Sequence, residues 1–178
     1  MKKRVLILSG SPRHGNSERL CREFMRGAEE AGHDVSLVRV ADKKIAPCLG
    51  CYYCTEHEGR CVRDDDMTEL LQDMIDADVL VLASPVYFYS VDAQLKAVID
   101  RTVARWTEVK NKELYYIVTM ADEELSSADT TVACLRGYAD CIEGAVERGV
   151  IIGNGVYEKD AVENTDAMRR AHEAGLGV

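Results

Sequence analysis

The stretch VLILSGSPRHGNS, residues 5–17, decides the fold of this chain. Four apolar residues, Val5 to Leu8, run into a turn that contains Gly10 and Gly15, and a helix is predicted to begin near Ser17. A continuous apolar run of this kind is typical of a strand covered on both faces, as in a parallel sheet. The stretch therefore predicts a strand, a tight loop and a helix, in that order.

The same succession of strand and helix recurs along the chain. Further apolar runs predict strands at 35–40, 79–82, 115–118 and 150–152. Apolar residues with helical spacing predict helices within 20–28, 67–75, 91–103 and 132–146, and a last helix from about Thr165 to Ala174. Because parallel strands need crossover helices, the pattern predicts an α/β fold, a flavodoxin-like three-layer sandwich with a five-stranded parallel sheet in the order 2-1-3-4-5. We expect one domain over residues 1–178.

Composition restricts the class of partner. No apolar run approaches the roughly 20 residues that a membrane-spanning helix needs, and a net charge of -9 disfavours binding to nucleic acid. The charged N-terminus is followed by too short an apolar stretch for a signal peptide. We therefore expect a cytoplasmic protein with small-molecule or protein partners, with neither a membrane nor a nucleic acid among them.

The loop after the first strand has the composition of a phosphate site. In this fold the ligand lies at the carboxyl ends of strands 1 and 3, which directs attention to loops 10–16 and 84–90. A helix start offers unpaired N–H groups and a positive dipole end to an anion. Candidate ligands are four neutral donors and one cation: Ser9, Ser11, Asn16, Ser17 and Arg13.

Three alternatives apply to this loop. Asn16 stands where a nucleoside-triphosphate loop needs Lys, and Pro12 stands where a dinucleotide motif needs its second glycine, so a single terminal phosphate is favoured. The remaining alternative is a capped turn without a ligand, with Ser17 as the N-cap.

Three separated motifs together resemble a known family. Three motifs, Gly-Ser-Pro-Arg-x-Gly-Asn-Ser at 10–17 with Ser9 before it, SPVYF at 84–88 and QLKAVIDR at 94–101, are similar to the NADPH-dependent FMN reductase family and its iron-sulfur flavoprotein branch. The resemblance implies that FMN is the cofactor and NAD(P)H the electron donor, in a homodimer or homotetramer. It also implies that the five candidate ligands surround the FMN phosphate. The residues along the isoalloxazine ring would be Pro85, Val86, Tyr87 and Phe88.

The loop at residues 84–90 carries no Asp, Glu, His or Lys as an obvious acid or base. Backbone amides there are candidates to face the edge of the flavin, and Tyr87, Phe88 and Tyr89 are candidates for a stacking wall. No catalytic residue is assigned, because the chemistry belongs to flavin N5. The alternative is that these aromatic side chains cap the core or pack at a subunit interface.

The most unusual feature is a cysteine-rich loop at residues 48–61. Its spacing, Cys48-x2-Cys51-x2-Cys54-x6-Cys61, is close to that of cysteines that bind iron-sulfur clusters. The resemblance implies a [4Fe-4S] cluster near the flavin. Zinc, and a loop that holds no metal, remain as alternatives. Asp64, Asp65 and Asp66 are expected to cap the helix beginning near Met67, and the other cysteines, at 21, 134 and 141, to pack as small core residues.

The sequence thus predicts an FMN-dependent oxidoreductase that takes reducing equivalents from NAD(P)H and passes them to a quinone, flavin or other acceptor. The alternative is an iron-sulfur flavoprotein that carries electrons for ferredoxin-like partners. The paired loops favour the first, and the cysteine loop motivates the second.

Overall fold

The computed structural model describes residues 1–178, and its five strands form one parallel sheet. The strands are β1 (Arg4–Ser9), β2 (Asp34–Arg39), β3 (Val79–Pro85), β4 (Glu113–Thr119) and β5 (Val146–Gly153), paired in the order β2-β1-β3-β4-β5. Both the α/β class and the predicted strand order are confirmed. None of the helices combines the length and the apolar composition needed to cross a lipid bilayer.

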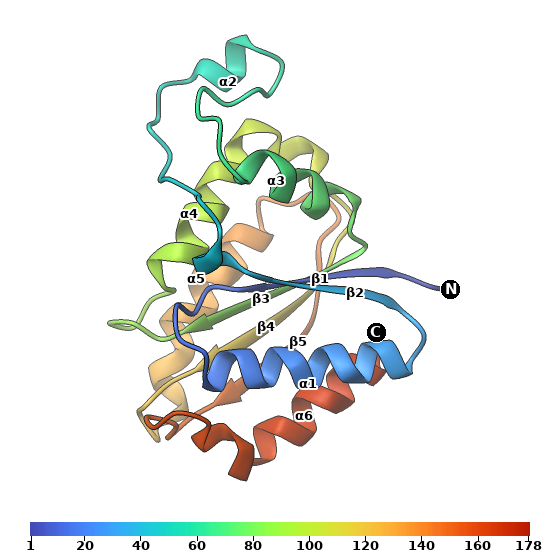
Figure 1. The fold of residues 1–178 in the computed structure, drawn as a ribbon, viewed down its shortest axis with the longest axis vertical. Coiled ribbons are helices and arrows are strands. Elements are labelled where there is room, and N and C mark those ends of the chain that lie inside the picture. The colour runs from blue at the N-terminus through green and yellow to red at the C-terminus, as the bar shows by residue number, and fades with distance from the viewer.

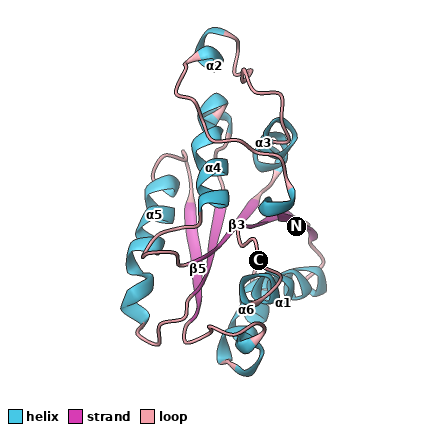
Figure 2. Ribbon diagram, turned by 60° about the vertical axis from the view of Figure 1, so that its left-hand side comes forward, coloured by secondary structure: helices cyan, strands magenta, loops and turns pink.

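Helices cover both faces of this sheet (Figure 1). One face carries α1 (Asn16–Glu30) and α6 (Asp166–Leu176), which lie side by side; the other carries α3 (Met67–Asp76), α4 (Ala93–Arg101) and α5 (Asp129–Ala139). Figure 2 shows the same separation with the sheet between the two layers. A short helix, α2 (Tyr53–Glu56), lies in a loop that projects away from the sheet.

Alternating side chains of each strand feed two separate cores. Leu6 and Leu8 of β1 point into the core under α3, α4 and α5, whereas Val5 and Ile7 point into the core under α1 and α6. All four side chains are buried. This explains why β1, β3 and β4 contain continuous apolar runs, since strands covered on both faces favour apolar side chains at successive positions.

The end of α5 differs from the prediction. The helical spacing of apolar residues within 132–146 continues past Ala139, but α5 ends there, and Val146 is the first residue of β5. Gly144, with φ +71°, turns the chain between them. Cys21 is buried as expected, whereas Cys134 is half-buried and Cys141 is exposed beyond the helix end, so the expectation of a core position is wrong for Cys141.

Candidate functional site

The loop from β1 to α1 ends at a helix terminus without a side-chain cap. Gly15 occupies the N-cap position, and no side chain accepts a hydrogen bond from the first turn of α1. The first-turn N–H groups of a helix have no partner within the helix, and together with the dipole they favour an anion. The expected alternative of Ser17 as the N-cap is not what the structure shows.

In front of this helix end lies a cavity of about 250 Å³ at the carboxyl edge of the sheet. Four loops line it, those that follow β1, β3, β4 and β5. The lining residues are Ser11, Arg13, Asn16, Ser17, Pro85, Val86, Tyr87, Thr119, Met120, Ala121, Val156 and Tyr157. The first seven were predicted from the sequence. The other five were missed, although position at the ends of β4 and β5 was a usable signal for them.

Two predicted ligands lie away from the cavity. The side chain of Ser9 is fully buried, and its hydroxyl has no hydrogen-bond partner. Phe88 is fully exposed and does not line the cavity. Their assignments to the phosphate and the ring therefore gain no support from the geometry and stay predictions.

The side chain of Asn16 is used to hold another loop. Its Nδ2 donates to the carbonyl oxygens of Val156 and Glu158, both at 2.9 Å, and its Oδ1 accepts from the N–H of Val162 at 3.2 Å. These contacts engage both ends of the amide, so the backbone N–H of Asn16 is the group left to face an anion. Ser17 Oγ lies 2.6 Å from Thr119 Oγ1 and so ties α1 to the end of β4.

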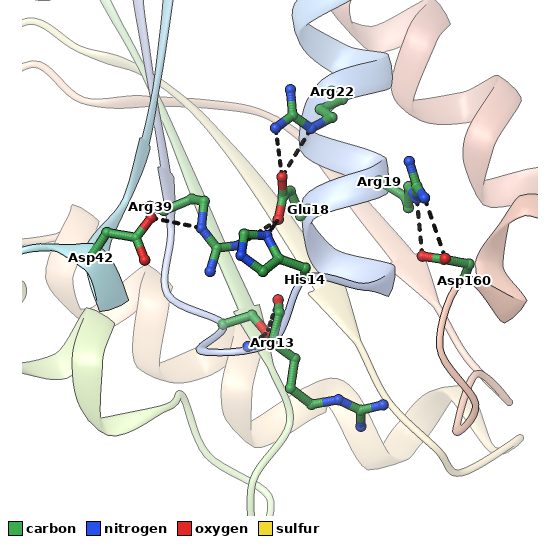
Figure 3. Close-up of polar contacts among 9 residues, drawn as sticks. Arg13, His14, Glu18, Arg19, Arg22, Arg39, Asp42 and Asp160 are labelled. Atoms are coloured by element: carbon green, nitrogen blue, oxygen red, sulfur yellow. Dashed lines mark hydrogen bonds and ion pairs between the residues drawn. The ribbon is translucent and has the colours of Figure 1, made fainter.

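Arg13 is the cation of the loop with no charged partner. Its guanidinium makes no hydrogen bond or ion pair, and in Figure 3 it points away from the neighbouring charged groups. Beside it, the Glu18 carboxylate is buried among His14 at 2.9 Å, Arg22 at 2.6 Å and Arg39 (Figure 3). Burial acts to raise the pKa of Glu18, but the hydrogen bonds from Arg22 and His14 and the charge of Arg39 outweigh it, and the pKa is lowered. Glu18 is thus an ionised but neutralised group, and it does little to offset the positive end of α1.

The loop after β3 forms a tight hairpin turn with left-handed backbone. Tyr87 and Ser90 exchange two backbone hydrogen bonds of 3.0 and 3.1 Å, with Phe88 at φ +50° and Tyr89 at φ +59° between them. Left-handed backbone costs a bulky residue about 1–2 kcal/mol, and such strain is often retained at functional sites. The N–H of Val86 donates to the carbonyl of Thr119 and that of Tyr87 to Ser90, so neither is available to a ligand.

A buried carboxylate joins the two loops. Asp92 caps α4 by accepting from the N–H of Leu95 at 2.9 Å, and it accepts a hydrogen bond from Ser84 Oγ at 2.8 Å. A Cβ on Gly10 would lie only 2.2 Å from its Oδ2, so the first loop requires glycine at this point. Burial raises the pKa of Asp92 against the opposing effect of the hydrogen bonds from Leu95 and Ser84. Asp92 therefore fixes the spacing between the loop after β1 and the loop after β3.

The cysteine loop projects from the other end of α4. Cys48 and Cys51 are exposed, Cys54 and Cys61 are half-buried, and no group of three or more Cys, His, Asp or Glu side chains is placed to hold a metal ion. As they lie here, the four cysteines are not gathered into a metal site. The prediction that they bind an iron-sulfur cluster rests on their spacing and on the family resemblance.

Arg101 fastens the base of this loop. Its side chain is 2% exposed and donates to both oxygens of Asp65, at 2.7 and 2.8 Å, and to the carbonyl of Ala46 at 2.8 Å. Further out, Gly59 packs so closely on Ala104 and Arg105 that a Cβ there would lie 2.6 Å from Arg105 Cγ. Asp65 thus acts mainly as the partner of Arg101, although it also accepts from the first N–H of α3 at 3.3 Å, as expected of a capping residue.

Larger cavities exist but lack this convergence of loops. One of about 440 Å³ lies between the cysteine loop and α4, and an apolar one of about 430 Å³ lies between α4 and α5. Only the smaller cavity lies where the winding of the sheet reverses, which is where α/β sheets of this type bind ligands. We therefore take it as the candidate site.

Known proteins of similar sequence include several iron-sulfur flavoproteins. An iron-sulfur flavoprotein of Methanocaldococcus jannaschii is 45% identical over 100 residues, 56% of this chain and 51% of that protein. One of Archaeoglobus fulgidus is 44% identical over 97 residues, 54% of this chain and 49% of that protein. The match thus spans about half the length of each relative.

Solved structures show the same fold at low sequence identity. An NAD(P)H:quinone oxidoreductase from Methanothermobacter marburgensis superposes with a TM-score of 0.78 at 18% identity, over 99% of this chain and 97% of that one. An FMN-dependent NADH-azoreductase from Bacillus anthracis, in complex with FMN, gives 0.75 at 17% identity, over 98% of both chains. The family described as NADPH-dependent FMN reductase matches residues 3–131. This match covers most of the chain and confirms the resemblance seen in its motifs: the chain belongs to the NADPH-dependent FMN reductase family.

Proposed function

We propose that this protein is an FMN-dependent oxidoreductase that takes reducing equivalents from NAD(P)H and passes them to a quinone, flavin or other acceptor. The observation that carries the proposal is the cavity at the carboxyl ends of β1 and β3, which combines an uncapped helix terminus with the unpaired cation of Arg13. Membership of the FMN reductase family and the names of relatives, among them an FMN-dependent NADH:quinone oxidoreductase of Thiobacillus denitrificans, support it.

The residues of the cavity suit a flavin better than chemistry by side chains. No Asp, Glu, His or Cys lines it, so the cavity holds no carboxylate, imidazole or thiol to act as acid, base or nucleophile. When bound, FMN supplies hydride acceptance at N5. The first-turn amides of α1, Ser11 and Arg13 would hold the phosphate, and Pro85, Val86 and Tyr87 would contact the ring by side chains and carbonyl groups, since two of their amides are already bonded.

Changing Ser11 to Ala and Arg13 to Glu together is expected to weaken FMN binding about 100-fold, because a charge-assisted pair contributes about 1.5–3 kcal/mol and the new carboxylate repels the phosphate. Arg13 is exposed, and the hydroxyl of the buried Ser11 bonds only to the backbone of Arg13, so urea unfolding of the variant should stay within about 1 kcal/mol of the wild type. Flavin fluorescence titration measures the first effect. Equal FMN affinity in variant and wild type would show that this loop does not bind the FMN phosphate.

Turnover tests the enzymatic part of the proposal. The FMN-loaded protein is expected to oxidise NADPH or NADH steadily when a quinone or free flavin is added, as measured by absorbance at the nicotinamide band. Negligible turnover with either donor, together with fast reduction by a reduced ferredoxin, would instead establish an electron carrier.

An electron carrier is the second candidate function, and the cysteine loop favours it. The relatives from Methanocaldococcus and Archaeoglobus are named iron-sulfur flavoproteins, and we propose Cys48, Cys51, Cys54 and Cys61 as the ligands by their spacing. Anaerobic purification followed by iron and acid-labile sulfide assays should give about four of each per chain. Cys141→Ser, which removes an exposed thiol outside the loop, should contain as much iron as the wild type. Absence of iron in the anaerobically purified wild type would contradict the proposal that these cysteines bind a cluster.

We propose further that the chain acts as a single domain over 1–178 in a cytoplasmic homodimer or homotetramer. Phe88, Tyr89 and Tyr157 expose large aromatic surfaces, which is common at contacts between subunits. Light scattering after size-exclusion chromatography measures the assembly, and a monomer at micromolar concentration would contradict it.

A further inference from the structure

The loop after β5, residues 154–160, lies beside the phosphate loop although the two are far apart in the sequence. Val156 and Tyr157 line the cavity together with Ser11, Arg13 and Tyr87. The loop lies outside residues 3–131, the part of the chain that matches the family. The family match therefore says nothing about residues 154–160, and the contacts of this loop indicate its role.

The first turn and a half of α1 hold this loop in place. Asn16 makes the three hydrogen bonds to Val156, Glu158 and Val162 described above. One turn on, Arg19 pairs with both oxygens of Asp160, at 3.0 and 3.3 Å (Figure 3), and with Glu163 at 3.0 Å. The same helix end that faces the cavity thus fixes the position of the loop.

This attachment brings a second cation to the helix terminus. A Cβ on Gly15, the N-cap of α1, would lie 3.9 Å from Cγ of Lys159, so the Lys159 stem passes over the start of the helix. The remaining length of the side chain lets its ammonium reach an anion held at the first-turn amides. Its neighbour Asp160 is already paired with Arg19, and Lys159 itself has no ion-pair partner.

Tyr157 provides a wall on the same loop. Its side chain is 71% exposed, yet it lines the cavity with Tyr87, which comes from the loop after β3. A flat ligand that covers an aromatic side chain this exposed removes much apolar surface from water, which favours binding.

We propose that the loop after β5 is a second wall of the FMN site, in which Lys159 pairs with the phosphate and Tyr157 packs against the remainder of the cofactor. The inference rests on the proposed function and adds a specificity to it. Arg13 lines the cavity and the Lys159 stem lies beside Gly15, and two cations near the helix terminus would favour phosphorylated flavin over riboflavin. Asn16 is the positioning residue that holds the loop for this task.

The test compares FMN with riboflavin, which lacks the phosphate. Lys159→Met is expected to weaken FMN binding about tenfold, which corresponds to about 1.4 kcal/mol, and to leave riboflavin binding unchanged. Lys159→Arg should restore most of the loss. The matched control is Lys110→Met, which removes an equally exposed charge before β4, at the opposite edge of the sheet. Tyr157→Ala is expected to weaken both flavins by the same factor.

Each result of this titration decides the inference. A loss of FMN affinity confined to Lys159→Met, and smaller in high salt where exposed charges are screened, supports it. Equal losses in Lys159→Met and Lys110→Met, or FMN affinity unchanged in Lys159→Met, overturn it while the proposed function stands. A wild-type protein that binds neither flavin overturns both.

Discussion

Replacing Asp65 with Asn is expected to lower the free energy of unfolding by about 3–5 kcal/mol at pH 7, since removal of one partner leaves a buried charge uncompensated. That charge is the Arg101 guanidinium, whose side chain is 2% exposed. Urea unfolding of the flavin-free protein measures the change. Asp64→Asn is the matched control, because Asp64 is exposed and its side chain makes no hydrogen bond or ion pair, and its effect should stay within about 0.5 kcal/mol.

The same pair predicts a dependence on pH. Burial acts to raise the pKa of Asp65, but the hydrogen bonds from Arg101 and from the Ala46 N–H outweigh it and hold the pKa below its usual value of 3.8. A lowered pKa in the folded protein gives a stability that is present above the unfolded value and is lost as pH falls through the folded one. The difference between wild type and Asp65→Asn should therefore shrink below about pH 4. A difference that stays constant from pH 7 to pH 3 would contradict the pairing.

Gly10→Ala is expected to cost about 2–4 kcal/mol and to weaken FMN binding as well. The new methyl group would lie 2.2 Å from Asp92 Oδ2, and the buried carboxylate can move only by giving up its cap on α4. Overpacking costs about 1–3 kcal/mol, and loss of an N-cap about 0.5–2. Thermal and urea unfolding measure the stability, and flavin titration the site.

A second substitution separates this steric explanation from a general intolerance of the loop. Asp92→Gly removes the side chain that the methyl group meets, and glycine is itself an acceptable N-cap. Gly10→Ala with Asp92→Gly should therefore be more stable than the sum of the two single effects by at least about 1 kcal/mol. Simple additivity would show that the contact between Gly10 and Asp92 is not the cause.

The sheet could be predicted from the sequence because its physical cause is visible there. Strands buried on both faces must be apolar throughout, so β1, β3 and β4 appear as uninterrupted runs. The boundary between α5 and β5 could not be predicted in the same way. Ile142 and Val146 continue the helical spacing, but Gly144 turns the chain, and Val146 pairs with Glu113 instead.

The candidate site was predictable in its location more than in its details. The glycine-serine loop and the motif around Pro85 line the cavity as expected, because both follow strands whose place in the sheet is set by the winding. The role of the Asn16 side chain depends on contacts with residues 140 or more positions away. Contacts of that range, like the approach of Lys159 to Gly15, are settled only when the last strand and helix pack.

The two ends of the cysteine loop, residues 44–46 and 65–66, are held together where the loop joins the domain. Lys44 and Asp66 bond to each other through the backbone, at 3.1 Å, and Arg101 bridges Ala46 and Asp65. The chain therefore leaves and re-enters the body at neighbouring positions, and Gly59 adds a contact with Ala104 and Arg105. Doubling the length of such a closed segment costs only about 0.6 kcal/mol. Insertions, deletions or replacement of the segment between positions 47 and 64 should leave the sheet undisturbed. This segment can therefore vary in length and sequence during evolution while the rest of the domain keeps its fold.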